Sequence, residues 1–281
     1  MSTWREVLAD TTAALDHPHE ARFICEHAAG LDAGEFATSL DHLVTQRMGL
    51  HVHDMVRRRI AGEPLQYVMG RWAFRHLDVL VDPRVLIPRP ETELVAEVAL
   101  HLAREVSGHR TVVDLGTGSG VIGLSLAFEL PLEDTTVWLT DVSSDALDVA
   151  RANLAGIGRA GANVHISEGS WYEALPTALH ESVDVIVSNP PYIAINDPDL
   201  AQEVASFEPP LALFADEDGL ASLRTVVSQA PRWLRRGGAL VLEIGHRQGD
   251  AVRSLLIEAG LCSVEIRRDL AGRDRVAVAR R

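Results

Sequence analysis

The spacing of hydrophobic positions changes along the chain and predicts two different folds. In residues 1–66 apolar side chains recur at helical spacing, and no segment reads as a convincing strand. Helices are expected over residues 4–14, 21–29, 40–50 and 52–61. Glycines and a proline punctuate these segments. The N-terminal part is therefore predicted to be a small bundle of about four or five helices.

A different pattern follows at residues 67–88. Residues 68–74 and 77–81 read as two short strands, which suggests a β-hairpin connecting two domains. Two prolines then block a helix before Glu91, and the acidic residues after them suit a first helical turn. A helical stripe is formed by Leu94, Val95, Val98, Ala99, Leu102 and Val106.

From Thr111 onward, strand and helix patterns alternate. Strands are expected at 111–115, 135–140, 163–167, 183–188, 238–244, 262–268 and 275–280, and helices at 121–130, 145–155, 219–234 and 247–260. Alternation predicts an α/β fold with a mostly parallel sheet covered by helices on both faces. The last two strands are joined by too few residues for a parallel crossover, so they should form an antiparallel hairpin. We thus expect a helical bundle at 1–66, a hairpin linker at 67–88 and a main domain at 89–281.

The net charge of the chain limits the classes of molecule that it is expected to bind. The 281 residues carry 26 cations, all of them Arg, against 40 Asp and Glu, a formal net charge of −14. An acidic chain is a poor general binder of nucleic-acid backbones, so no direct nucleic-acid partner is expected. Three successive arginines at 57–59 fit either a local basic patch or, as the favoured interpretation, a solvated helix face.

The sequence predicts no membrane segment, secretory signal or metal site. No apolar run is long enough to cross a bilayer, and residues 1–6 lack a basic stretch followed by an apolar one. Cys25 and Cys262 fit two ordinary buried thiols of a reducing compartment. The twelve histidines show no metal-ligand spacing. We expect a cytoplasmic protein that acts as a monomer.

The most informative segment is Asn189-Pro190-Pro191-Tyr192. It ends a predicted buried strand whose four apolar residues are all β-branched. Prolines lack an N–H, so the backbone here offers acceptors and few donors, while Asn adds an acceptor oxygen and Tyr a flat face. Such a site suits a planar group that carries an –NH2, either the amide of Gln or Asn or the exocyclic amine of adenine or cytosine.

A glycine-rich turn follows the strand at 111–115. Glycines let a backbone approach a ligand closely, and the helix after them presents free N–H groups. A second strand ends at Asp141, 21 residues after Gly120, where an acid can hold the two ribose hydroxyls of a nucleoside. Residues 118–123 also fit the dinucleotide pattern G-x-G-x-x-G, so NAD or FAD stays an alternative on the loop alone.

Asp114 favours S-adenosyl-L-methionine over NAD or FAD as the cofactor. This acid stands at the strand end facing the turn, where it would repel a pyrophosphate and attract the cationic sulfonium and ammonium of that cofactor. Asp114, Asp141, residues 167–171 and Asn189 all follow predicted strands, and ligand sites of open α/β sheets lie at the carboxyl ends of strands. We therefore expect these groups to meet in one crevice where a methyl group is transferred.

At these residues the chain resembles a known family, the protein-(glutamine-N5) methyltransferases of the HemK family, which act on bacterial peptide chain release factors. The resemblance covers residues 62–281. It is carried by the segments 86–93 (LIPRPETE), 114–120 (DLGTGSG), 187–193 (VSNPPYI), 208–213 (EPPLAL) and 269–275 (DLAGRDR). It implies a Rossmann-like, seven-stranded methyltransferase domain. One departure is Arg75-His76, where the family usually carries Gly after Phe74.

The resemblance also implies roles for individual residues. The cofactor S-adenosyl-L-methionine would be held by Asp114, Gly116, Thr117, Gly118, Ser119, Gly120, Asp141, Trp171 and Asn189. Within that set, the glycine loop would line the methionine part, Asp141 would hold the ribose and Trp171 would pack on the adenine. The substrate glutamine would be held by Asn189, Pro190, Pro191 and Tyr192, with Asn189, Pro190 and Tyr192 acting in catalysis. The helical N-terminal domain would help to dock the release factor, whose Gly-Gly-Gln loop enters the crevice.

Several alternatives stay open on the sequence. Adenine-N6 methylation of DNA or RNA uses the same acceptors, and a ribosomal protein is a second candidate glutamine substrate. A scaffold that binds cofactor without turnover and a nicotinamide enzyme are further classes. Trp171 also fits plain core packing, and Glu91 with Thr92 fits an N-terminal helix cap. Glu243, at a strand end, is a weaker candidate for the site.

Overall fold

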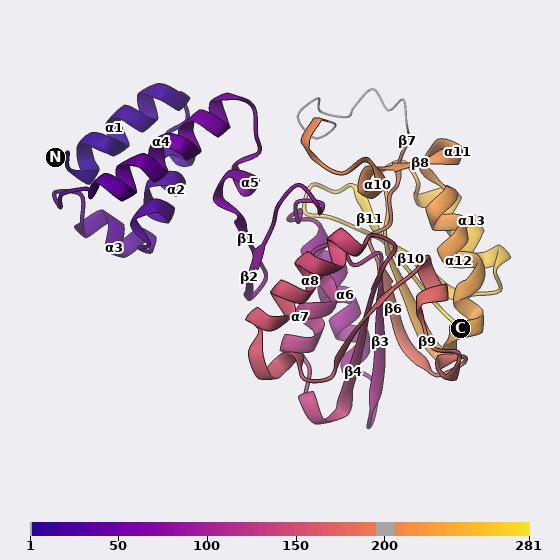
Figure 1. The fold of residues 1–281 in the computed structure, drawn as a ribbon. Coiled ribbons are helices and arrows are strands. Elements are labelled where there is room, and N and C mark those ends of the chain that lie inside the picture. The colour runs from indigo at the N-terminus through magenta and orange to yellow at the C-terminus, as the bar shows by residue number, and fades with distance from the viewer. Residues whose placement is uncertain (1, 195–205) are drawn as a thin grey trace. The chain divides into compact units, whose positions relative to one another are not determined.

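The computed structural model describes residues 2–194 and 206–281, which separate into two compact units. The first contains residues 2–71 together with residues 206 and 207, and the second contains residues 72–194 and 208–281. Each unit has its own hydrophobic core. Figure 1 traces the chain through both units.

The first unit is helical, as predicted. Its helices are α1 (Trp4–Leu15), α2 (Pro18–Ala29), α3 (Ala33–Thr38), α4 (Gln46–Ile60) and α5 (Leu65–Met69). Trp4, Ile24, Phe36 and Met55 are buried in its core. The predicted helices at 40–50 and 52–61 are instead one helix that begins at Gln46. The side chain of Thr45 accepts the Met48 N–H at 3.3 Å, which caps the helix there.

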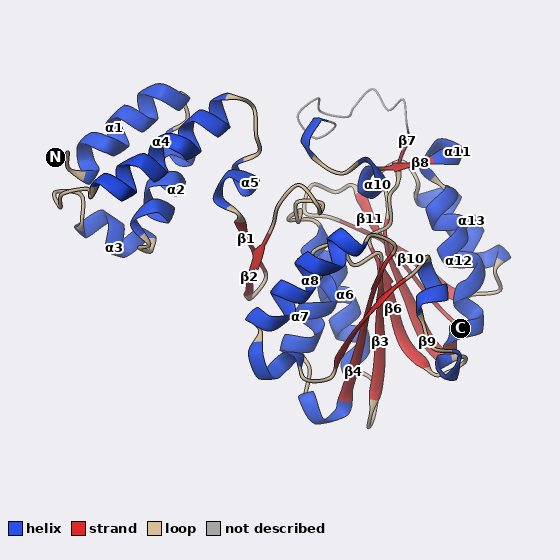
Figure 2. Ribbon diagram, in the orientation of Figure 1, coloured by secondary structure: helices blue, strands red, loops and turns tan. Residues whose placement is uncertain are grey.

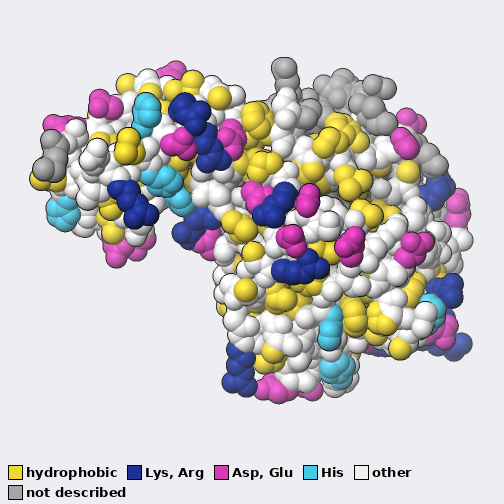
Figure 3. Space-filling view, in the orientation of Figure 1, with side chains coloured by type: hydrophobic (Ala, Val, Ile, Leu, Met, Phe, Trp, Pro, Cys, Tyr) yellow, Lys and Arg dark blue, Asp and Glu magenta, His cyan; other side chains and the backbone are white. Residues whose placement is uncertain are grey.

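The favoured interpretation of the three successive arginines holds only for Arg57, which is exposed, whereas Arg58 and Arg59 are partly buried. Each pairs with an acid of the same unit: Arg57 with Asp54, Arg58 with Glu63 and Arg59 with Glu20. On the face shown in Figure 3, basic side chains elsewhere also lie beside acidic ones. The thiols differ from expectation in one respect, because Cys25 is buried but Cys262 is exposed.

The predicted hairpin is present but begins later than expected. Its strands are β1 (Arg71–Phe74) and β2 (Leu77–Leu80), and residues 68–69 belong to α5, which ends at Gly70 with φ +69°. The tip is where the sequence departs from its family. Arg75 has φ +52°, a conformation that favours glycine. Its guanidinium donates to both carboxylate oxygens of Glu129, at 2.7 and 2.9 Å. This ion pair offsets the cost of a backbone conformation that glycine would adopt more easily.

Within the described residues of the second unit, seven strands form one sheet in the order β10-β11-β9-β6-β3-β4-β5. The strands are β3 (Arg110–Leu115), β4 (Thr135–Asp141), β5 (Val164–Glu168), β6 (Val183–Ser188), β9 (Leu234–Glu243), β10 (Cys262–Arg268) and β11 (Asp274–Arg280). The five strands from β9 to β5 are parallel, and β11 is antiparallel to both neighbours. The predicted α/β fold with its terminal antiparallel hairpin is confirmed. Ile193–Ala194 (β7) and Phe214–Ala215 (β8) form a separate parallel pair.

The start of β9 was predicted wrongly. The strand begins at Leu234 rather than 238, because the glycines at 237 and 238 form an irregularity inside the strand and do not mark its start. A Cβ on Gly238 would lie 2.8 Å from the Val183 carbonyl oxygen, so only glycine permits this approach of β9 to β6.

Helices cover both faces of the sheet, as Figures 1 and 2 show. One face carries α6 (Thr92–Arg104), α7 (Val121–Glu129) and α8 (Ser144–Gly156), and the other carries α12 (Ala221–Trp233) and α13 (Gly249–Glu258). The helix predicted at 219–234 is α12, and the short helix α11 (Asp216–Gly219) precedes it. Shorter pieces are α10 (Pro210–Leu213) and the 3-10 helices at Leu132–Asp134, Gly158–Gly161, Trp171–Ala174 and Thr177–Leu179. Because helices cover both faces of the sheet, β3 and β6 are buried on both faces, which explains their near-continuous apolar runs.

Candidate active site

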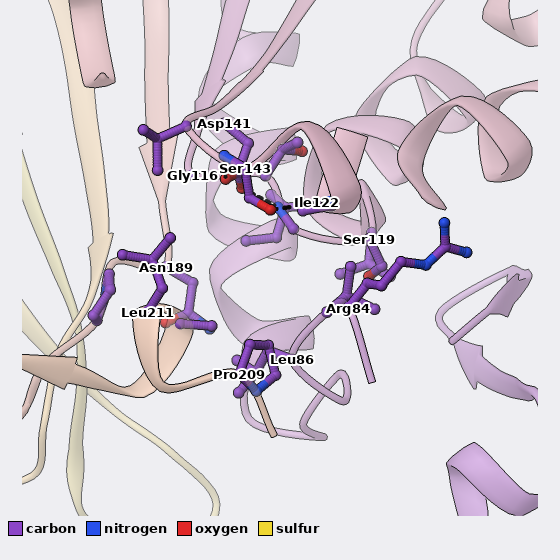
Figure 4. Close-up of a pocket in the computed structure, with 18 of the residues that line it drawn as sticks. Arg84, Leu86, Gly116, Ser119, Ile122, Asp141, Ser143, Asn189, Pro209 and Leu211 are labelled. Atoms are coloured by element: carbon purple, nitrogen blue, oxygen red, sulfur yellow. Dashed lines mark hydrogen bonds between the residues drawn. The ribbon is translucent and has the colours of Figure 1, made fainter. Parts of the chain in front are cut away.

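A cavity of about 420 Å³ opens in the second unit at the carboxyl ends of β3, β4 and β6. Its wall includes the glycine loop, Asp141, Trp171 and Asn189, which the sequence predicted to converge (Figure 4). It also includes two segments that the strand-end argument missed, residues 84–88 and 209–214. A volume of this order suits a cofactor or small ligand.

The glycine loop is shaped by backbone conformations that side chains disfavour. Gly116, Gly118 and Gly120 have φ of +67°, +55° and +89°, and Gly120 stands directly before α7. Gly116, Thr117, Gly118 and Ser119 line the cavity. The loop is tied to the next strand because the Thr117 N–H donates to the Thr140 carbonyl oxygen at 2.9 Å. The glycines therefore let the backbone itself form one wall of the site.

Asp114 lies beneath this loop and is not among the residues that line the cavity. Its Oδ2 accepts the Thr117 hydroxyl at 2.6 Å and the Gly123 N–H at 2.9 Å. Its Oδ1 is buried without a hydrogen-bond partner in the described part of the chain. Burial raises the Asp114 pKa to about 6. The carboxylate therefore shapes the loop and places negative charge under it, and its predicted contact with a cofactor stays a prediction.

Asp141 does reach the cavity. Its Oδ2 accepts the Gly118 N–H and its Oδ1 accepts the Ser143 N–H, both at 2.9 Å. Burial raises its pKa above the usual value. The two hydrogen bonds fix the carboxylate between the glycine loop and the start of α8. Trp171 completes this side, because its ring lies close enough to Gly116 that a Cβ there would be 3.4 Å from the indole.

The segment 189–192 divides between the cavity and the protein interior. Asn189 and Pro191 line the cavity, whereas Pro190 is buried and neither it nor Tyr192 is among the lining residues. The Tyr192 hydroxyl donates to Glu243 Oε1 at 3.0 Å. Its backbone carbonyl accepts the Gln248 side-chain N–H at 3.1 Å. The structure thus places Tyr192 as a fixed support beside the cavity, and its predicted packing on a substrate stays a prediction.

Other residues of the site were undervalued by the sequence argument. Thr92 does not cap α6, since its hydroxyl donates to Glu243 Oε2 at 2.7 Å and lies 3.5 Å from Asn189 Nδ2. The buried Glu208 carboxylate accepts the Ile87 N–H at 3.1 Å and pairs with Arg89. This joins the two lining segments that the strand-end argument missed. Thr92 and Glu208 belong to segments that carry the family resemblance, which was the available signal.

Fold and site together define the class of protein: the chain is a Rossmann-like methyltransferase whose methyl donor is S-adenosyl-L-methionine. The residues present fit this cofactor, because the cavity wall combines a glycine loop with a fixed carboxylate at Asp141, and the buried Asp114 carboxylate lies under that loop. The domain described as "Methyltransferase small domain" matches residues 94–206, and "PrmC N-terminal domain" matches residues 4–70.

Comparison with individual proteins narrows the class to one family. A release factor glutamine methyltransferase of Xylella fastidiosa is 50% identical over 98% of this chain and 96% of its own. One of Burkholderia pseudomallei is 43% identical over 93% of this chain and 91% of its own. A methyltransferase structure from Pyrococcus furiosus, 17% identical, has the same fold with a TM-score of 0.53 over 80% of this chain and 96% of that chain. The chain belongs to the release factor glutamine methyltransferase family, and the predicted family is confirmed.

The described residues offer no membrane span of helical type and no metal site. None of their helices is both long and apolar enough to cross a membrane. They also contain no cluster of His, Cys, Asp and Glu side chains that could hold a metal ion.

Proposed function

We propose that this enzyme transfers a methyl group from S-adenosyl-L-methionine to the side-chain amide nitrogen of the glutamine in the Gly-Gly-Gln loop of bacterial peptide chain release factors. The observation that carries the proposal is the position of Asn189 in the same cavity wall as the glycine loop and Asp141. An amide-holding group and a cofactor-holding loop thus face one space.

The chemical difficulty is the substrate nitrogen, whose lone pair is delocalised into its carbonyl group. The cofactor, when bound, supplies an electrophilic methyl group on a sulfonium. We propose that Asn189 Oδ1 and the Pro190 carbonyl oxygen each accept one N–H of the glutamine amide, while Pro191 and Tyr192 bound its plane. Two fixed acceptors aim the lone pair and stabilise positive charge that develops on nitrogen. Transfer leaves the cofactor as a neutral thioether and the methylated amide with a positive charge, and this cation loses its N–H proton easily, so no strong base is required before transfer.

We propose a separate role for each residue that would hold the cofactor. Asp141 would accept the ribose hydroxyls, Trp171 would pack on the adenine and the loop 116–120 would surround the methionine part. Residues 1–66 would dock the release factor, 67–88 would connect, and 89–281 would carry the chemistry. We further propose that the enzyme acts as a monomer in the cytoplasm without binding nucleic acid, which its net charge of −14 supports.

The test is methyl transfer from labelled S-adenosyl-L-methionine to purified release factor, ribosomal protein and duplex DNA. Mass spectrometry should locate the methyl group on the glutamine of the Gly-Gly-Gln loop. Label on adenine would instead identify an adenine-N6 enzyme, and label on a ribosomal protein the second glutamine substrate.

A variant tests the proposed role of Asn189. Asn189→Ala should lower the transfer rate about 10²–10³-fold, as removal of one aimed donor or acceptor does elsewhere. Cofactor affinity, measured by calorimetry, should change little. Near-normal turnover in this variant would contradict the mechanism.

A further inference from the structure

A buried hydrogen-bond network joins the cavity wall, to which Thr92 and Asn189 belong, to Glu243, and the mechanism above gives no role to Thr92 or Glu243. Its centre is Glu243, the last residue of β9, which is fully buried. One carboxylate oxygen accepts the Thr92 hydroxyl at 2.7 Å and the other accepts the Tyr192 hydroxyl at 3.0 Å. Through these two contacts Glu243 is linked to both ends of the segment 189–192, because Thr92 also lies 3.5 Å from the amide nitrogen of Asn189.

The direction of each hydrogen bond follows from the number of protons available. Arg275 has only donors, and its Nη1 lies 3.4 Å from the Tyr192 hydroxyl oxygen. The single Tyr192 proton is therefore directed to Glu243. An ionised Glu243 has only acceptors, so the single Thr92 proton also points to it. The Thr92 oxygen is then left with lone pairs alone and can only accept.

This direction decides how the Asn189 side chain is turned. An amide can present either NH2 or oxygen to a neighbour with almost the same shape, and the hydrogen-bond network selects between them. Because the Thr92 oxygen can only accept, Asn189 must direct its NH2 group toward Thr92. Its oxygen is then free for the cavity, where the proposed mechanism needs an acceptor. The 3.5 Å distance is long for a hydrogen bond, and such contacts commonly tighten when substrate binds.

We propose that Thr92 and Glu243 are positioning residues that fix the Asn189 amide with its oxygen toward the substrate nitrogen. The proposal rests on the role of Asn189 proposed above. The opposite orientation would present two donors to the substrate NH2 group, which is itself a donor, and would hold the glutamine away from the methyl group.

The same argument makes the orientation depend on the charge of Glu243. Burial raises its pKa to about 7, Glu91 adds to the rise, and Thr92, Tyr192 and Arg275 oppose it. A protonated Glu243 can donate to Thr92, whose proton is then free to point at Asn189 and reverse the amide. The rate of methyl transfer should therefore fall as the pH drops below about 7, while Glu243 takes up its proton.

The first test compares Thr92→Val, which keeps the shape and removes the hydroxyl, with Thr92→Ser, which keeps the hydroxyl. Single-turnover transfer to release factor is measured at saturating cofactor and substrate. Thr92→Val should lower the rate by about tenfold or more, since Asn189 loses the acceptor that selects its orientation. The KM for cofactor should stay within about twofold, and Thr92→Ser should recover most of the rate.

The second test uses Glu243→Gln. The glutamine amide must turn its oxygen toward Tyr192, whose proton points at residue 243 and away from the donor Arg275, so its NH2 faces Thr92. The rate should fall about 10–100-fold, and its decline below pH 7 should disappear. Asp114, whose pKa is about 6, is unchanged in both proteins and so controls for other titrating groups.

The outcomes separate the two proposals. Wild-type rates in Thr92→Val together with a large loss in Asn189→Ala would overturn the positioning role alone. Near-normal transfer by Asn189→Ala would overturn the proposed function of that residue instead. If Glu243→Gln fails to fold, as judged by circular dichroism, the comparison of Val with Ser at position 92 still decides the matter.

Discussion

Gly123 offers a quantitative test of how α7 supports the glycine loop. A Cβ added at this position would lie 2.1 Å from Cδ2 of Leu139 and 3.1 Å from Cβ of Asp114. Carbon atoms in contact normally lie about 3.5–4.0 Å apart. Leu139 is fully buried in β4 and has little room to withdraw, so Gly123→Ala must displace α7 from the sheet.

The expected cost follows from two opposing terms. Overpacking a core by one methyl group costs about 1–3 kcal/mol, and this contact is close enough to place the cost near 3 kcal/mol. Replacing glycine by alanine in a helix interior raises the unfolding free energy by about 1 kcal/mol. The net loss in unfolding free energy is about 2 kcal/mol, which lowers Tm by about 4–8 °C in a domain of this size.

The same displacement should weaken cofactor binding. The Gly123 N–H donates to the Asp114 oxygen that also holds Thr117, so moving α7 moves the loop. We expect the Kd for S-adenosyl-L-methionine to rise about tenfold, or about 1.4 kcal/mol. Urea unfolding and calorimetry would measure the two effects.

Gly156→Ala is the matched control. Gly156 ends α8 in the same unit, it has no positive φ, and a Cβ there would meet nothing within 4 Å. This variant should keep its affinity and be unchanged or slightly more stable. The reasoning is refuted if Gly123→Ala behaves like Gly156→Ala in both measurements.

Three further predictions follow from ion pairs and buried acids. Arg75→Gly relieves a positive φ worth about 1 kcal/mol but leaves Glu129, only 10% exposed, without its guanidinium. We expect a net loss of about 1–2 kcal/mol in urea unfolding that a second change, Glu129→Gln, largely restores; wild-type stability in the single variant would contradict this. Glu208→Gln removes the charge that holds Arg89 and should raise the cofactor Kd about fivefold by calorimetry, whereas an unchanged Kd would show that this pair does not shape the cavity. Because burial raises the Glu243 pKa from 4.5 to about 7, the folded protein binds more protons than the unfolded chain between these values, and wild type loses stability as the pH rises through them. The unfolding free energy of Glu243→Gln relative to wild type should therefore increase between pH 5 and pH 8, and a constant difference would show that Glu243 does not titrate in this range.

Local sequence determined the elements and the chemistry of this protein. The β-branched runs predicted β3 and β6 almost to the residue, because strand preference and burial act over a few neighbouring side chains. The glycines at 116, 118 and 120 predicted a loop of unusual backbone conformation, which their positive φ values confirm. Asn189 and Asp141 could be placed in one crevice because parallel strands end at the same sheet edge.

Only the tertiary structure showed how the strands are ordered and which contacts hold the residues of the site in place. The order of the parallel strands was not predictable, since a connection that contains a helix can reach either neighbouring position in a sheet. Gly238 was predicted as the first residue of its strand, and only the fold shows that β9 begins earlier and approaches the Val183 carbonyl at this glycine. The sequence likewise did not show that Asp114 holds Thr117 and Gly123 under the loop.

The hydrogen-bond network around Glu243 is the clearest example of a feature that the sequence alone could not predict. Thr92 and Tyr192 are 151 and 51 residues away from Glu243 in sequence. Tyr192 meets it because β9 lies beside β6 in the sheet, and Thr92 meets it because α6 packs against β9. Periodicity and turn chemistry report on neighbours along the chain. The direction of a buried hydrogen bond depends on which donors and acceptors the folded sheet brings together, and that information appears only in three dimensions.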